Sequence, residues 1–302
     1  MTERTYKQAL VTYIDILAFK EFVRASEKEP TRIAEIDRIL LVLKTQLTNS
    51  PRFKYAEDGP PEQLFRAFSF SDLTVRATLI DPENDLLNTF NREIQILAEK
   101  QLEVACWGGD EWETFPVLLR GAISMGLILM DPVELRNDQI FGPALVRSYE
   151  LESETAVFPR IVIDRDLMKK VNNPENKLYR QFITRGDDGI DFVNYLSGCT
   201  EYFQAGEPII FHNSSTTFEN HKRMIEKAVD QLKKAKTKPG DRVIQKYLWL
   251  VNYHNRAVDQ IPLAGPGEVP AMFPGEPDEE SVEQTNLTNR VALKISEDLL
   301  NF

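Results

Sequence analysis

Two short apolar runs in this sequence each contain a single aspartate, and this pattern constrains the fold more than any other feature. Asp15 lies within the run over 11–19, and Asp72 lies within the run over 68–75. A buried carboxylate without a partner costs several kcal/mol, so such an acid normally faces a counter-charge or a metal. If the two runs are neighbouring strands of one sheet, their carboxylates form an oxygen-ligand site suited to Mg²⁺ or Mn²⁺.

The composition is that of a globular protein and argues against some classes of partner. The chain has 302 residues, of which 42% are hydrophobic and 27% are charged, so it is long enough for one large domain or two small ones. The net charge of −11 argues against broad binding to nucleic acid or to an anionic membrane, because both require a basic surface. A small anionic substrate held by a metal and a few arginines remains compatible with this charge.

Cysteine usage and the N-terminal residues indicate a cytoplasmic protein. The two cysteines, Cys106 and Cys199, form no CxxC motif, which argues against structural zinc and against a disulfide framework. The first five residues are polar and lead directly into a predicted strand, unlike a signal peptide. No apolar run approaches the length of a membrane span.

Hydrophobic periodicity predicts an α+β fold in the first part of the chain. The predicted strands cover 8–17, a pair over 64–79 that turns near Ser71-Asp72, 116–130 and 159–163. The predicted helices cover 18–28, 31–48, 82–105 and 143–154, the second with an apolar stripe of Ile33, Ile36, Leu40, Leu43 and Leu47. The core of this order is a βαββαβ unit, so we expect a ferredoxin-like sheet with additions.

The pattern changes beyond residue 180. We predict a hairpin over 182–195 and two further amphipathic helices, with apolar stripes of Phe218, Ile225, Val229 and Leu232 and of Val243, Tyr247, Leu250 and Val251. We therefore treat 1–257 as one domain with C-terminal helical additions, and 258–302 as a proline-rich acidic linker with a terminal helix. That helix, over 288–301, is expected to dock on the parent domain or on its dimer mate, through Val291, Leu293, Ile295 and Leu299.

Each aspartate also has a purely structural interpretation. Asp15 could cap the helix that follows the first strand, and Asp72 could stabilise its turn. For a single acid this interpretation is preferable, whereas two acids in this strand order favour the metal site.

Four segments resemble class III nucleotidyl cyclases. Residues 13–19 resemble the first-strand signature of that class, 70–73 its hairpin aspartate, 119–126 a later core strand and 141–152 the helix after that strand. Together with 246–255, they are most similar to the bacterial pyrimidine cyclases of Pycsar antiphage systems. The resemblance covers about residues 8–257.

The resemblance implies a site and an assembly. Asp15, Asp72 and the Ile16 carbonyl would hold two Mn²⁺ or Mg²⁺ ions. Backbone N–H groups around Ala18 and Phe19, at a helix N-terminus, would bind the β- and γ-phosphates. The active enzyme would be a homodimer with its active sites at the subunit interface.

Three positions depart from the pattern of purine-specific relatives. Phe68 occupies the place of a base-recognising lysine, and Val146 and Glu150 occupy the places of a catalytic asparagine and arginine. Arg120 and Arg147 are the nearest candidate replacement cations. Arg120 lies in an apolar strand and so needs an anionic partner, whereas Arg147 fits a solvated helix face equally well.

The resemblance therefore predicts cyclisation of a pyrimidine nucleoside triphosphate to its 3′,5′-cyclic monophosphate with release of pyrophosphate. UTP is favoured over CTP, and the product would act as a second messenger in bacterial antiphage defence. A cytidylate cyclase, a noncatalytic nucleotide-binding protein with a decayed cyclase fold and a purine cyclase are the alternatives.

Two further features receive structural interpretations. The segment 107–112 resembles the GGDEF signature of diguanylate cyclases, but it lies outside the core hairpin and is predicted to be a turn made by two glycines. The three histidines, His212, His221 and His254, have no ligand spacing and are expected to be structural or exposed.

Overall fold

A computed structural model gives the placement of most of the chain. It describes residues 5–48, 65–80, 85–111, 117–130, 139–172, 182–196, 204–205, 207–208, 214–238, 241–260 and 291–300. Residues 49–64, residues 261–290 of the predicted linker and terminal segment, and His212 lie outside the described residues. The chain divides into two compact units, one of Met1–Val104 with Val117–Tyr195 and one of Ala105–Pro116 with Leu196–Phe302.

The sheet of the first unit has the strand order β2-β3-β1-β4-β6-β8-β7, and β5 pairs with β4. Its strands are β1 (Lys7–Ile16), β2 (Phe65–Phe70), β3 (Leu73–Leu79), β4 (Leu119–Met130), β5 (Ile140–Phe141), β6 (Ile161–Ile163), β7 (Ile183–Arg185) and β8 (Asp191–Val193). β1 is antiparallel to β3 and to β4, and β2 is antiparallel to β3. This order and these directions are those of a βαββαβ ferredoxin-like core, so the predicted α+β fold is confirmed.

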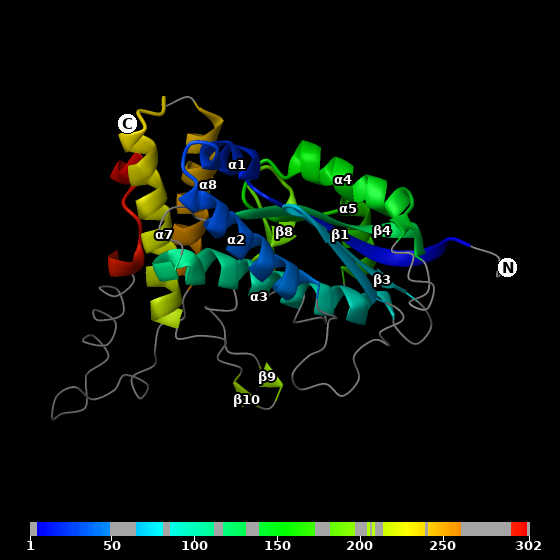
Figure 1. The fold of residues 1–302 in the computed structure, drawn as a ribbon. Coiled ribbons are helices and arrows are strands. Elements are labelled where there is room, and N and C mark those ends of the chain that lie inside the picture. Colours follow the sequence, from blue (N-terminus) through cyan, green and yellow to red (C-terminus); the bar gives the residue numbers. More distant parts are fainter. Residues whose placement is uncertain are drawn as a thin grey trace, which may run out of the picture. The chain divides into compact units, whose positions relative to one another are not determined.

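Helices cover both faces of this sheet (Figure 1). Those of the first unit are α1 (Phe19–Ser26), α2 (Thr31–Leu47), α3 (Leu86–Glu111, which continues into the second unit), α4 (Pro143–Thr155) and α5 (Arg165–Val171). α4 packs on β1 and β4, while α2 and α3 lie on the opposite face. Alternate apolar residues of the strands fill the space beneath α4, where the buried cluster is Ala9, Val11, Val75, Ala77, Leu79, Ile128 and Ala144.

The face covered by α3 contains a fully buried ion pair. Arg76 of β3 donates from Nε and Nη2 to the Glu93 carboxylate of α3, at 2.8 and 3.0 Å. The Thr12 hydroxyl of β1 donates to the same carboxylate at 2.7 Å, and Arg76 also donates to the Leu47 carbonyl at the end of α2. Because the Arg76 and Glu93 side chains are only 1% and 2% exposed, every charge here depends on its protein partners.

Removing one member of this pair should be costly. Glu93→Gln leaves the Arg76 guanidinium buried without its counter-charge, so we expect the free energy of unfolding to fall by about 3–5 kcal/mol. Urea denaturation of the full chain measures this. The control is Lys169→Ala, which breaks the exposed Lys169–Asp166 pair and should cost less than about 1 kcal/mol. Equal losses in the two variants would contradict the assigned role of the buried pair.

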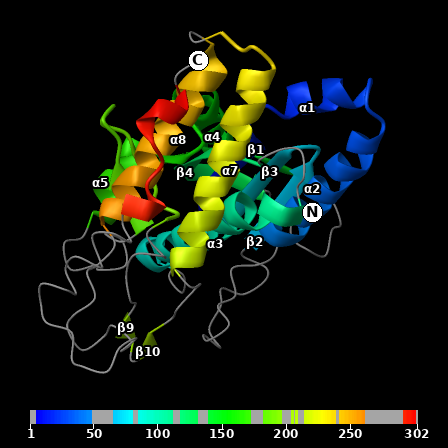
Figure 2. The same cartoon turned by 90° about the vertical axis from the view of Figure 1, so that its left-hand side faces the viewer.

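The second unit contains α7 (Ser214–Lys234), α8 (Arg242–Asp259), η4 (Glu297–Leu300) and the short pair β9 (Gln204–Ala205) and β10 (Glu207–Pro208). The predicted stripes of α7 and α8 are largely buried, and the C-terminal segment runs beside both helices (Figure 2). Asn255 donates to the Ile295 carbonyl at 2.9 Å and accepts from the Ile295 amide at 2.8 Å. Of the two docking sites predicted for the C-terminal segment, the structure shows the one on its own chain, with Ile295 buried.

Two of the three histidines, His221 and His254, are fully buried and in contact. The Nδ1 atoms of His221 and His254 lie 2.9 Å apart, and His254 Nε2 lies 3.0 Å from the Leu293 carbonyl oxygen. Since a carbonyl only accepts, His254 donates from Nε2, and His221 then donates to its Nδ1. Burial lowers the pKa of His254 to about 4 and the pKa of His221 well below its usual value, so both rings are neutral. The structural role expected for these residues is confirmed.

Several local predictions are wrong. The two glycines at 108–109 belong to α3, which continues to Glu111, and they do not form a turn. A glycine costs about 1 kcal/mol in a helix relative to alanine, which a 26-residue helix tolerates. Ile33 is 58% exposed on α2 and Val291 is 65% exposed in the tail. Described residues 291–300 hold a helical turn over 291–293 and the 3₁₀ helix η4, so 288–301 is not one continuous helix.

Candidate functional site

Asp15 lies near the end of β1, on the sheet face that α4 covers. It stands directly opposite Arg120 of β4 in the antiparallel register. Arg120 donates from Nε and Nη2 to Asp15 Oδ2, at 3.1 and 2.8 Å. The anionic partner that the sequence requires for Arg120 is therefore Asp15, and the pair is partly exposed.

Asp72 reaches the same place from the turn between β2 and β3. Phe70 pairs with Leu73, so Ser71 and Asp72 form a two-residue turn, and Ser71 adopts the positive φ of 54° that tight hairpin turns favour. The Asp72 side chain is hydrogen-bonded to the Asp15 carboxyl. The structure thus brings together the two aspartates that the sequence singled out.

Two carboxyl groups in contact cannot both ionise freely. Burial, followed by the hydrogen bond and charge of Asp72, raises the pKa of Asp15 from 3.8 to about 7, although Arg120 opposes this rise. Burial, together with the surrounding acids, also raises the pKa of the Tyr13 phenol on the same face to about 12. The site therefore carries an excess of negative potential.

These oxygens fit a divalent cation. Asp15 and Asp72 supply two adjacent carboxylates, and the Ile16 carbonyl follows Asp15 in the chain. A cation bound there would relieve the repulsion that raises the pKa of Asp15. Within the described ranges no group of three or more His, Cys, Asp and Glu side chains has the geometry of a metal site. The candidate ligand set is thus two acids and a carbonyl.

Glu152 is a member of the site that sequence reasoning missed. It lies on α4 with its side chain 4% exposed, and its Oε1 is 2.7 Å from Arg120 Nε. Burial raises its pKa, which Arg120 lowers in turn. Only the packing of α4 on β4 brings it to Arg120, because the two residues are far apart in sequence. The local sequence, Glu150-Leu151-Glu152, does not tell which glutamate points inward.

The remaining candidates are spread around this centre. Arg147 of α4 donates to the Asp164 carboxylate at 3.2 Å from both Nε and Nη2, and no described contact joins it to Asp15. Ala18, with a left-handed φ of 67°, precedes α1, so the first amides of that helix, beginning at Phe19, follow directly after β1. Phe68 is a half-buried residue of β2.

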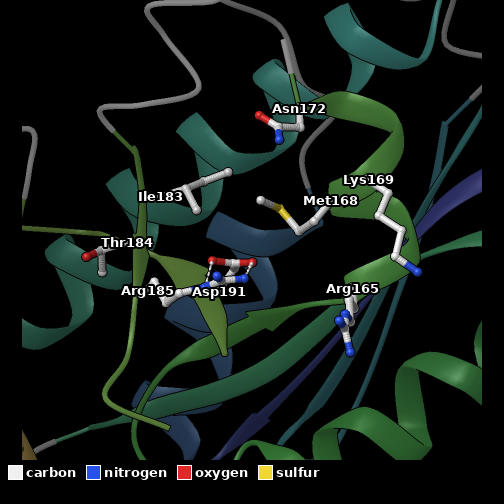
Figure 3. Close-up of a pocket in the computed structure, with 8 residues that line it drawn as sticks. All are labelled: Arg165, Met168, Lys169, Asn172, Ile183, Thr184, Arg185 and Asp191. Atoms are coloured by element: carbon white, nitrogen blue, oxygen red, sulfur yellow. Dashed lines mark hydrogen bonds and ion pairs between the residues drawn. The ribbon is translucent and has the colours of Figure 1, made fainter. Parts of the chain in front are cut away.

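A separate cavity of about 510 Å³ lies between α5 and the β7–β8 hairpin (Figure 3). Met168 extends from α5 toward Arg185 and Asp191, which form an ion pair at 3.0 Å. Lys169, another lining residue, pairs with Asp166 at 2.6 Å. None of the residues predicted for the site lines this cavity, and two of its cations already have carboxylate partners.

Among the comparisons with known proteins, only the search of solved structures finds chains that are similar to this one. No family model matches the chain, and no curated protein matches it. Three crystal structures are similar. The guanylyl cyclase Cya2 is 12% identical with a TM-score of 0.43, and the match covers 63% of this chain and 92% of that chain. The adenylyl cyclase CyaB from P. aeruginosa is 16% identical with a TM-score of 0.41, covering 63% of this chain and 95% of that chain. The catalytic core of a rhodopsin-guanylyl cyclase with converted specificity in complex with ATPαS is 13% identical with a TM-score of 0.40, covering 64% of this chain and 98% of that chain. Likenesses of this strength establish neither an activity nor a substrate.

None of the helices in the described ranges combines the length and the apolar character needed to cross a bilayer.

The raised pKa of Asp15 predicts a specific pH dependence of stability. Without metal, the neutral Asp15 carboxyl makes its full contribution to the stability of the fold below about pH 4. This contribution is lost as the pH rises through about 7, because the carboxyl then ionises. Asp15→Asn removes this titration, so the melting temperature of the variant relative to wild type should be higher at pH 8 than at pH 5. Thermal unfolding in the presence of a chelator measures the difference.

The control for this measurement is Asp166→Asn. Asp166 is exposed and its hydrogen bond to Lys169 lowers its pKa, so it is ionised at both pH values and its relative melting temperature should not change. If the effect of Asp15→Asn on the melting temperature were independent of pH, the pKa of Asp15 would not be raised in the folded protein.

Proposed function

We propose that the chain is a class III nucleotidyl cyclase that converts a pyrimidine nucleoside triphosphate, preferentially UTP, into its 3′,5′-cyclic monophosphate and pyrophosphate. The observation that carries the proposal is the contact between Asp15 on β1 and Asp72 in the β2–β3 turn of a ferredoxin-like sheet. These are the positions at which the sequence resembles the metal-binding motifs of that class. The resemblance to Pycsar enzymes makes antiphage signalling the proposed role of the product.

In the proposed chemistry, a small set of residues binds the metal ions, the phosphates and the base. Asp15, Asp72 and the Ile16 carbonyl would hold two Mn²⁺ or Mg²⁺ ions, which when bound would acidify the ribose 3′-hydroxyl and neutralise the triphosphate. The first amides of α1, beside Ala18 and Phe19, would bind the terminal phosphates as helix N-termini bind anions. Arg120 and Arg147 are the candidate cations for the phosphates or the base.

Base selection is proposed to depend on Phe68. At this position purine cyclases use a lysine donor, whereas Phe68 presents an apolar ring. A pocket built for one base edge rejects another edge strongly, because its polar groups would be left unpaired. A noncatalytic nucleotide-binding protein is the second candidate, and Val146 and Glu150, in the places of the catalytic asparagine and arginine, favour it.

The decisive experiment is a competition assay with UTP, CTP, ATP and GTP at equal concentration and Mn²⁺, in which the products are identified by mass. We expect cyclic UMP as the main product, and no product from Asp15→Ala or Asp72→Ala variants that remain folded by circular dichroism. If cyclic AMP or cyclic GMP were the main product, the chain would be a purine cyclase and the pyrimidine proposal would be wrong. Absence of every product with intact nucleotide binding would favour the noncatalytic alternative.

The proposed enzyme is a homodimer with C₂ symmetry. Phe70, two residues before Asp72, is 81% exposed, and Val146 and Tyr149 of α4 are also exposed apolar residues. We expect sedimentation to give a dimer at micromolar concentration and Phe70→Asp to shift it toward monomer. Ile33→Asp, at an exposed position of α2, is the matched control and should leave the dimer intact. A monomeric wild type under conditions of turnover would contradict the assembly.

A further inference from the structure

Arg120 lies between two carboxylates but is hydrogen-bonded to only one. Its Nε and Nη2 donate to Asp15 Oδ2, at 3.1 and 2.8 Å. Glu152 Oε1 is nearer to Nε, at 2.7 Å, yet this buried oxygen has no donor aligned for a hydrogen bond. The short contact between Arg120 Nε and Glu152 Oε1 is therefore an ion pair without hydrogen-bond alignment, and the N–H groups of the guanidinium point at Asp15 instead.

This arrangement leaves Glu152 in an unfavourable state. A buried acceptor without an aligned donor is unfavourable, and a charged one is more so. The side chain is 4% exposed, so solvent has little access to it. Asp15 holds the guanidinium because it also faces the Asp72 carboxyl and needs a counter-charge of its own.

We propose that Glu152 is a positioning residue that receives the Arg120 guanidinium when a divalent cation binds to Asp15 and Asp72. This inference rests on the metal site of the proposed function. A cation on Asp15 competes with Arg120 for Oδ2, because two positive groups on one carboxylate oxygen repel each other. Arg120 then turns toward Glu152, and the acceptor oxygen that lacked a donor gains one.

The consequence is that Glu152 strengthens metal binding through Arg120. Without the Glu152 carboxylate, the displaced guanidinium has no charged acceptor beside it and remains a competitor at Asp15. A simpler role for Glu152, as one more negative charge near the site, would strengthen metal binding whether or not Arg120 is present. The two roles differ in whether the effects of Arg120 and Glu152 are coupled.

A double-mutant cycle separates them. Mn²⁺ binding to the full chain without nucleotide is measured by the electron paramagnetic resonance signal of free Mn²⁺, for wild type, Glu152→Gln, Arg120→Gln and the double variant. We expect Glu152→Gln to raise the Mn²⁺ dissociation constant about tenfold in the wild-type background, within the range of couplings between contacting groups, and less than about twofold in the Arg120→Gln background.

Two further variants keep the test valid if Arg120→Gln fails to fold. Glu152→Asp keeps the charge but shortens the side chain by one methylene, so it should weaken Mn²⁺ binding nearly as much as Glu152→Gln. Glu150→Gln removes an exposed charge from the same helix and should change the dissociation constant less than about twofold, since exposed charges are screened.

Equal effects of Glu152→Gln in both backgrounds, wild-type affinity in Glu152→Asp, or no effect of Glu152→Gln would each overturn the proposal while the metal site of the proposed function stands. A wild-type chain that binds no Mn²⁺ would overturn the metal site itself and this inference with it.

Discussion

The cross-strand pair of Asp15 and Arg120 is the interaction on which the site depends. The two residues face each other because β1 and β4 pair in a single antiparallel register over the whole of β1. A one-residue slip of that register would send one of them to the other face of the sheet. Gly121 helps to fix the pairing, since a Cβ atom there would collide with the Tyr13 carbonyl. The geometry of the acids is therefore set by backbone pairing of the central strands.

The sheet carries an arginine–carboxylate pair on each face, and their surroundings give them different properties. On the α3 face, Arg76 and Glu93 are almost fully buried and the Thr12 hydroxyl adds a further donor, so this pair is a permanent part of the core. On the α4 face, Arg120 and Asp15 are partly exposed beside the strand ends. The same ion-pair chemistry is thus structural where it is sealed from solvent, and under the proposed function it would be exchangeable where a cation competes.

Two carboxyls that lie together without a bound cation store electrostatic repulsion. Burial of Asp15, followed by the hydrogen bond and charge of the neighbouring Asp72, raises the pKa of Asp15, and Arg120 opposes this rise. In the proposed cyclase, such a site would trade stability of the metal-free protein for affinity toward the cation. In the described part of the unit of α7 and α8, the neutral His221–His254 pair and the Leu293 carbonyl instead satisfy one another in a buried setting.

The sequence by itself determined the ferredoxin-like core, because apolar periodicity and turn residues are local signals that survive in the strands and helices observed. It also identified Asp15, Asp72 and the need of Arg120 for an anion, since a charge in an apolar strand is visible without coordinates. Packing alone decided that Glu152 is the third acid of the site and that Arg147 turns to Asp164. These outcomes depend on which faces of distant elements meet, and that information is absent from the spacing of residues along the chain.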